Sequence, residues 1–176
     1  MCVGFVQYDA PLSIEETFSF DAGRDSITIS PKTTYTLTIS GSSTAPSKAS
    51  SNSEIATWRR VGDVMELNYA YRPANNSGTS AGSGTYMFGL PGSYTIDRSK
   101  VKVGTANADN GHVGTAVVYV PGKYLSGWAW AYDTTHIALS AGNDTNAPAI
   151  VSAANTSITR IEVVYSFKAS LPISGW

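Results

Sequence analysis

The segment GTSAG, residues 78–82, has the Gly-x-Ser-x-Gly spacing of a hydrolase nucleophile elbow, with Ser80 at its centre. His112 and His136, each with an aspartate nearby, could complete a catalytic triad. A nucleophile elbow requires a strand before the serine and a helix after it. Here the turn-like RPANNS precedes the serine, and the strand-like GTYMF follows it. We therefore interpret GTSAG as a hairpin loop and expect neither catalytic residues nor an enzyme.

Metal and cofactor chemistry is not indicated either. Two histidines cannot supply a three-histidine zinc site, and the lone Cys2 cannot form an intrachain disulfide or a cysteine metal site. The loop GNDTN, residues 142–146, is rich in oxygen donors but has one carboxylate, whereas calcium sites usually draw on several. We interpret it as a surface turn. A remaining alternative is an ion held by three copies of His136 at a three-fold axis.

The aromatic segment 124–132 raises the question of a binding surface. One of its faces carries Tyr124, Trp128, Trp130 and Tyr132. The other face carries the smaller Leu125, Gly127, Ala129 and Ala131. The favoured interpretation is that the aromatic face fills the core. The alternatives are a subunit interface, where Trp and Tyr are enriched, or a platform for sugar rings.

Strand-like segments must position all of these residues. Apolar side chains alternate with polar ones in 34–40, 63–71, 112–120, 124–132 and 159–167. A period of two with one polar face is typical of antiparallel sheets packed on one side. Short strands separated by Gly, Pro and Asn turns predict an all-β fold, an antiparallel β-sandwich or jelly roll. The single helix candidate is PLSIEETF, residues 11–18.

A composition change divides the chain. GSSTAPSKASSNS, residues 41–53, has no apolar side chain beyond alanine and proline and is interpreted as a linker or long loop. Residues 54–176 are predicted to form the β-sandwich domain. Residues 1–40 are too few to fold alone without disulfides or metal. We expect them to form a β-rich docking arm that adds strands to the main domain, exchanges with a neighbouring subunit or docks on another protein.

The charge content excludes several partners. Charged residues make up 14% of the chain and the net charge is −1, so nothing attracts nucleic acid or anionic lipid by bulk charge. No apolar run is long enough for a transmembrane helix, and the start of the chain does not resemble a signal peptide. We expect synthesis in a cytoplasm and no membrane insertion. The remaining surface, rich in Ser, Thr, Asn and Gly, suits extracellular or particle-borne β proteins.

The chain ends in the apolar segment LPISGW, residues 171–176. Leu171 and Ile173 continue the apolar face of the strand before them, whereas Pro172 cannot donate a ladder hydrogen bond. We expect an edge or a bend at Pro172. We also expect Trp176 to be covered by its own domain or by a neighbouring subunit.

Three segments in this order, 58–71, 82–97 and 166–176, together with Gly114-Thr115-Ala116, resemble a β-sandwich domain of bacteriophage virion proteins. The similarity covers about residues 44–176. Members of this family recur in tail-fibre and other receptor-binding or surface-exposed proteins. The resemblance carries over no catalytic residue. It marks as framework positions Trp58, Gly62, Asp63, Tyr86, Phe88, Leu90, Pro91, Tyr94, Ile96, Asp97, Leu171, Pro172 and Trp176.

The resemblance implies a protein of the virion surface. In fibre proteins a further domain usually follows this one, whereas this sequence stops at Trp176 and shows no fibre shaft. We therefore expect a trimeric capsid decoration or cement protein, attached to the major capsid protein or another virion protein through residues 1–40. The alternative is a tail-fibre or receptor-binding adhesin that recognises a host-surface glycan.

Overall fold

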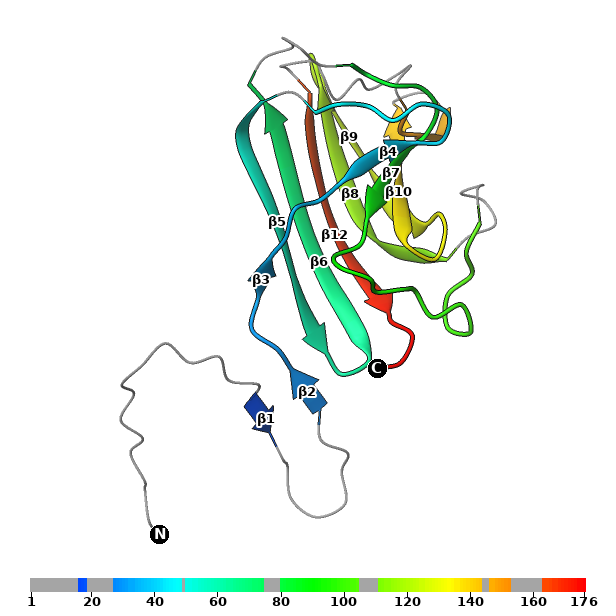
Figure 1. Ribbon diagram of the computed structural model, residues 1–176. Coiled ribbons are helices and arrows are strands. Elements are labelled where there is room, and N and C mark those ends of the chain that lie inside the picture. Colours follow the sequence, from blue (N-terminus) through cyan, green and yellow to red (C-terminus); the bar gives the residue numbers. More distant parts are fainter. Residues whose placement is uncertain are drawn as a thin grey trace.

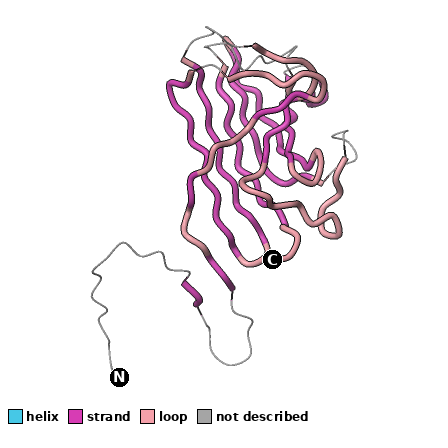
Figure 2. The backbone as a smooth tube through the Cα atoms, in the orientation of Figure 1, coloured by secondary structure: helices cyan, strands magenta, loops and turns pink. Residues whose placement is uncertain are grey.

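The computed structural model describes residues 16–18, 27–48, 50–74, 80–104, 111–143, 146–152 and 163–176. These residues form strands, turns and loops (Figure 2). None of them belongs to a helix, and so the described part of the chain contains no helix that could cross a membrane. The predicted all-β class is confirmed.

The described strands make one antiparallel sheet of twelve strands (Figure 1). The main path of the sheet has the order β1-β2-β5-β6-β12-β8-β9-β10-β7-β4, while β11 pairs with β10 and β3 pairs with β5. The strands are β1 (Glu16–Phe18), β2 (Ile27–Ile29), β3 (Thr33–Thr34), β4 (Ile39–Gly41), β5 (Ser51–Val61), β6 (Val64–Pro73), β7 (Tyr86–Gly89), β8 (His112–Val120), β9 (Lys123–Ala131), β10 (His136–Asn143), β11 (Asn146–Ile150) and β12 (Val164–Pro172).

The sheet curls into a half-barrel, and its inner face holds the core. Rather than two separate sheets, one hydrogen-bonded sheet bends until β7 lies against the inner face of β6 and β12. Phe88 of β7 has its ring 5.9 Å from Tyr69 of β6 and 5.3 Å from Phe167 of β12. All three side chains are almost fully buried. The aromatic rings therefore fill the space that the curl encloses.

The predicted alternation is confirmed on the strands that line this core. Met65, Leu67, Tyr69 and Tyr71 of β6 are at most 3% exposed. On β12, Tyr165, Phe167, Ala169 and Leu171 are likewise buried. β8 and β9 are joined at Pro121-Gly122, the predicted turn, where Gly122 has a φ of 87°. One buried face and one polar face per strand is the arrangement that a half-buried antiparallel sheet requires.

The helix alternative for residues 11–18 is wrong in its last three residues. Glu16, Thr17 and Phe18 form β1 and pair with Ile29, Thr28 and Ile27 of β2. Residues 11–15 lie outside the described part of the chain. A β-branched partner strand favours extended pairing, and this tertiary context overrides the weak helical pattern.

Residues 33–41 connect two distant parts of the sheet. β3 pairs with β5 through Thr33 and Thr34, whereas β4 pairs with β7 through Ile39, Ser40 and Gly41. The expected continuous strand over 34–40 is therefore interrupted, because the chain changes partner between its two ends. Leu37 lies midway and is 1% exposed. This segment, which we call the crossing segment, spans the open side of the half-barrel (Figure 1).

The segment predicted as a linker, 41–53, also contributes pairing. Gly41 ends β4, and β5 begins at Ser51. Between them, Thr44 and Ser47 form bridges with Ser83 and Ser80. Small polar side chains let this stretch follow a neighbouring loop closely: a Cβ atom added at Gly82 would lie 2.4 Å from the carbonyl oxygen of Thr44.

Candidate functional site

Several residues singled out in the sequence lie in the interior. Tyr86, Phe88, Pro91 and Leu171 are buried. Pro172 pairs with Val64 of β6, at a level where the pairing of β12 with β8 has already ended at Gly114. Its missing N–H therefore faces no ladder partner among the described strands, which is how a sheet tolerates proline.

Gly62 and Asp63 form the two-residue turn between β5 and β6. Gly62 has a φ of 64°, which glycine adopts without strain at the first position of such a hairpin turn. Lys100 donates a hydrogen bond to the Asp63 carboxylate, and this contact lowers the pKa of Asp63 below its usual value. The main chain of Asp63 accepts a hydrogen bond from Ile173, so the turn also holds the chain end.

Two aromatic rings and a guanidinium group pack against the chain end. The ring of Trp176 lies 6.2 Å from that of Trp58 in a stacked arrangement and 5.0 Å from that of Tyr94, edge to face. The Arg60 guanidinium lies 4.8 Å from the Trp176 ring on the side of the same cluster. Ile173 bridges to Ile96. Trp176 is thus packed against residues of its own chain, one of the two expected arrangements.

The aromatic face of β9 is predicted to fill the core, and the structure places Trp128 and Trp130 outside the main core cluster. The small residues Ala129 and Ala131 belong to the core, so the alternation of β9 places the two tryptophans on the outer face. Trp130 is nevertheless fully buried, and Trp128 is partly buried against His112, with ring centres 4.7 Å apart. The predicted burial is therefore met by Trp130 and in part by Trp128, whereas Tyr124 of the same face is 73% exposed. A Cβ atom at Gly127 would lie 1.7 Å from the carbonyl oxygen of Ser140.

The serine and histidines considered for catalysis have separate partners. Ser80 accepts and donates hydrogen bonds with Ser47. His136 Nδ1 lies 2.9 Å from the Asp133 carboxylate. Partial burial acts to raise the pKa of Asp133, but hydrogen bonds from Thr135 and His136 outweigh it, and the pKa is lowered. Within the described residues no hydrogen bond joins Ser80 to a histidine, and the aspartate before His112 lies outside them.

The described residues contain no group of three or more His, Cys, Asp and Glu side chains placed to hold a metal ion. Of the oxygen-rich loop 142–146, residues 144 and 145 lie outside the described part of the chain. No metal chemistry is therefore assigned to the described side chains.

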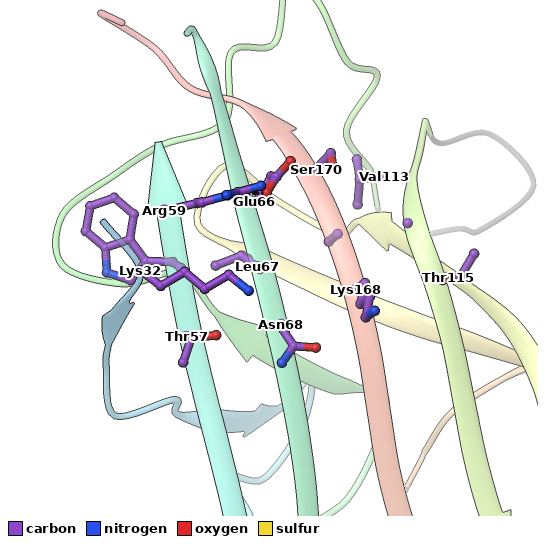
Figure 3. A pocket seen from close by; sticks show the side chains of 13 residues that line it. Lys32, Thr57, Arg59, Glu66, Leu67, Asn68, Val113, Thr115, Lys168 and Ser170 are labelled. Atoms are coloured by element: carbon purple, nitrogen blue, oxygen red, sulfur yellow. Dashed lines mark hydrogen bonds and ion pairs between the residues drawn. The ribbon is translucent and has the colours of Figure 1, made fainter. Parts of the chain in front are cut away.

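A groove on the outer face of the sheet is a candidate site (Figure 3). Its volume is about 410 Å³, and it crosses β5, β6, β12 and β8. The pairing register aligns one residue from each of these strands: Thr57 with Asn68, Asn68 with Lys168, and Lys168 with Thr115. Because side chains at paired positions share a face, these four polar side chains form one row across the sheet.

The groove is hollow where β8 carries a bulge. The pairing of β8 with β9 shifts between His112 and Gly114, so the backbone of β8 approaches β12 closely there. A Cβ atom at Gly114 would lie 1.9 Å from the carbonyl oxygen of Lys168, and only glycine fits this approach. The floor of the groove therefore has no side chain at this point.

The charges at the groove are unbalanced. At one end of the groove, Arg59 donates a hydrogen bond of 2.6 Å to Glu66, and the charges of these two side chains cancel. Lys32 and Lys168 also line the groove, and neither has an acidic partner among the residues that the structure describes. The groove thus presents two ammonium groups, unpaired as far as the structure describes the chain, beside hydroxyl and amide side chains; together they can hold an anion and donate hydrogen bonds to groups next to it.

The sequence reasoning missed this groove. Its residues come from segments between positions 32 and 170, and the alternation of each strand shows only that they face away from the core. The register between strands, which brings them into one row, is absent from the sequence pattern. A usable signal would have been the two lysines on polar faces without an acidic residue nearby in the sequence.

Comparison with known proteins shows a fold similarity. No protein-family model and no curated protein match the chain. The solved structure of the Dettilon tailspike protein (gp208) is similar to it, with a TM-score of 0.51 and 12% sequence identity. The similarity covers 82% of this chain and 24% of the tailspike chain, so this chain spans about a quarter of that protein. Membership of the virion β-sandwich family predicted for about residues 44–176 remains a prediction.

Proposed function

We propose that this chain is a structural protein of the exterior of a bacteriophage virion, attached through its amino-terminal segment. The fold similarity to a phage tailspike supports a location on a virion. The low content of charged residues supports a particle-borne protein. The attachment is carried by one observation, the position of β2. Figure 1 shows β1 and β2 beyond the end of the half-barrel.

Few contacts hold β2 to the body. Its ladder with β5 consists of the single pair Ile29 and Val61, supported by hydrogen bonds from Gly62 to Thr28 and from Ser30 to Arg60. Ile27 is 57% exposed and Ile29 is 36% exposed. Exposed isoleucines on a projecting strand suit pairing or packing against another protein.

In its first form, the proposal is a trimeric capsid decoration or cement protein whose arm contacts the major capsid protein or neighbouring subunits. Strand addition by β1 and β2 supplies the contact, and the half-barrel faces outward. Leu37 and Ile39 belong to the core of the half-barrel. The part of residues 1–40 that is free to dock therefore ends near Ser30.

The test removes residues 1–30 and compares particle binding with that of the full chain. We expect the truncated protein to keep its β-sheet circular dichroism spectrum and to lose co-sedimentation with particles that lack the protein. Ile27→Ser combined with Ile29→Ser should weaken binding in the same direction. Ile55→Ser is the matched control, because Ile55 is 52% exposed but lies on β5. Stoichiometric binding by the truncated protein would refute attachment through the arm.

A second form places the chain in the tail as a receptor-binding protein. The specific observation that favours it is the similarity to a tailspike. A density map of the native particle distinguishes the two forms, since decoration places copies over the capsid and the second form places them at the tail. Density in neither place would contradict both.

A further inference from the structure

The outer groove offers more than a structural surface. Its row of Thr57, Asn68, Lys168 and Thr115 crosses four strands, and Figure 3 shows the labelled side chains of this row on neighbouring strands. Neighbouring strands lie about 4.8 Å apart, so the row is about 14 Å long. This length suits a short oligomer of small polar units rather than a single small ion.

The charge and hydrogen-bonding groups of the groove define the chemistry of an occupant. Lys32 and Lys168 line it as cations without a described acidic partner, whereas Arg59 is engaged by Glu66. Between the cations lie hydroxyl and amide groups, which donate and accept hydrogen bonds. An occupant that matches this set carries negative charge and many hydroxyl groups.

A peptide fits this groove poorly. β6 and β12 are paired on both sides at this level, so their backbone groups are already used and a peptide cannot add as a strand. The outward-facing side chains of the row are polar and provide no pocket for an apolar anchor. We infer that the groove binds a carboxylated oligosaccharide, with Lys168 at the carboxylate and Asn68 and Thr115 at neighbouring hydroxyl groups.

This inference rests on the proposal that the half-barrel faces outward on the virion, because a glycan-binding groove acts only where a host-surface glycan can reach it. Binding is nevertheless a property of the purified full chain. A failure to bind would leave the particle experiments unaffected, and a failure of the particle experiments would leave measured binding in place.

The test is calorimetric titration of the full chain with an oligogalacturonide at low salt. We expect saturable binding that weakens as the salt concentration rises, because exposed charges are screened. Lys168→Ala should lower the affinity roughly tenfold, which corresponds to about 1.4 kcal/mol. Asn68→Ala should lower it by a smaller factor. A neutral maltooligosaccharide of equal length should bind at least about tenfold more weakly than the acidic probe.

The matched control is Lys123→Ala, which removes the same charge at the start of β9. Lys123 pairs with Val120, which lies five residues along β8 from Thr115, a distance of about 17 Å. Its affinity should equal that of the unmodified chain. The inference is overturned by the absence of saturable binding, by equal losses in the Lys168 and Lys123 variants, or by equal binding of a poly-glutamate peptide.

Discussion

Replacing Trp176 with alanine tests whether the chain end is part of the folded body. The variant removes two ring contacts, with Trp58 and Tyr94, and the contact of the Arg60 guanidinium. Aromatic pairs contribute about 0.5–1.5 kcal/mol each beyond their burial, and an exposed cation–π contact about 0.5–1 kcal/mol. The free energy of unfolding should therefore fall by about 1.5–4 kcal/mol.

Thermal unfolding followed by circular dichroism measures this loss. For a chain of this size, about 1 kcal/mol shifts the unfolding midpoint by roughly 2–4 °C, so a decrease of roughly 3–16 °C is expected. Trp176→Phe should recover much of the loss, because a ring remains. Tyr124→Ala is the comparison: Tyr124 is 73% exposed and has one ring contact, with Tyr119 at 4.9 Å, so its removal should lower the midpoint by about 1–6 °C at most. Equal midpoints for the Trp176 and Tyr124 alanine variants would refute the packing argument.

Two further predictions concern other parts of the sheet. Gly114→Ala should lower the free energy of unfolding by more than about 2 kcal/mol, since its Cβ atom would lie 1.9 Å from a carbonyl oxygen. Urea unfolding measures this loss. The comparison is Gly142→Ala, where the atom nearest to the added Cβ would be 3.2 Å away. Asp133 has a lowered pKa in the folded state, so its contribution to stability is present above the unfolded pKa of about 3.9 and is lost as the pH falls through the folded value. Asp133→Asn should flatten the midpoint-against-pH curve below about pH 4, and an unchanged curve would contradict the assignment.

The sequence predicts which residues share a face, but not always which face lies inside. On β6 the apolar set Met65, Leu67, Tyr69 and Tyr71 has one possible location, because the alternative would bury charged side chains. On β9 both faces are apolar, and the choice depends on the space that remains inside the bend. At Gly127, for example, a Cβ atom would lie 1.7 Å from the carbonyl oxygen of Ser140 on β10, and such spacing between strands cannot be inferred from one strand's sequence.

The same limit applies to the functional surface. Thr57 and Lys168 lie on strands that are neither adjacent in sequence nor directly paired. Asn68 lies between them in the row because of the register of β5, β6 and β12. The resemblance to virion proteins singled out framework positions, many of which are buried, such as Tyr86 and Phe88. Interior positions support the fold, whereas the groove lies on the polar face, where sequence patterns carry little information.

The crossing segment, residues 33–41, has a consequence for self-association. A curled sheet that does not close into a barrel leaves exposed strand edges, which are templates for aggregation. Here the same short stretch pairs with β5 through two residues and with β7 through three. The crossing segment therefore covers Thr57 and Trp58 on the eleven-residue strand β5 and three residues of the short strand β7, and so occupies part of each edge. The covered stretches are thereby closed to strand addition by a second copy, as would matter where many copies crowd on one surface.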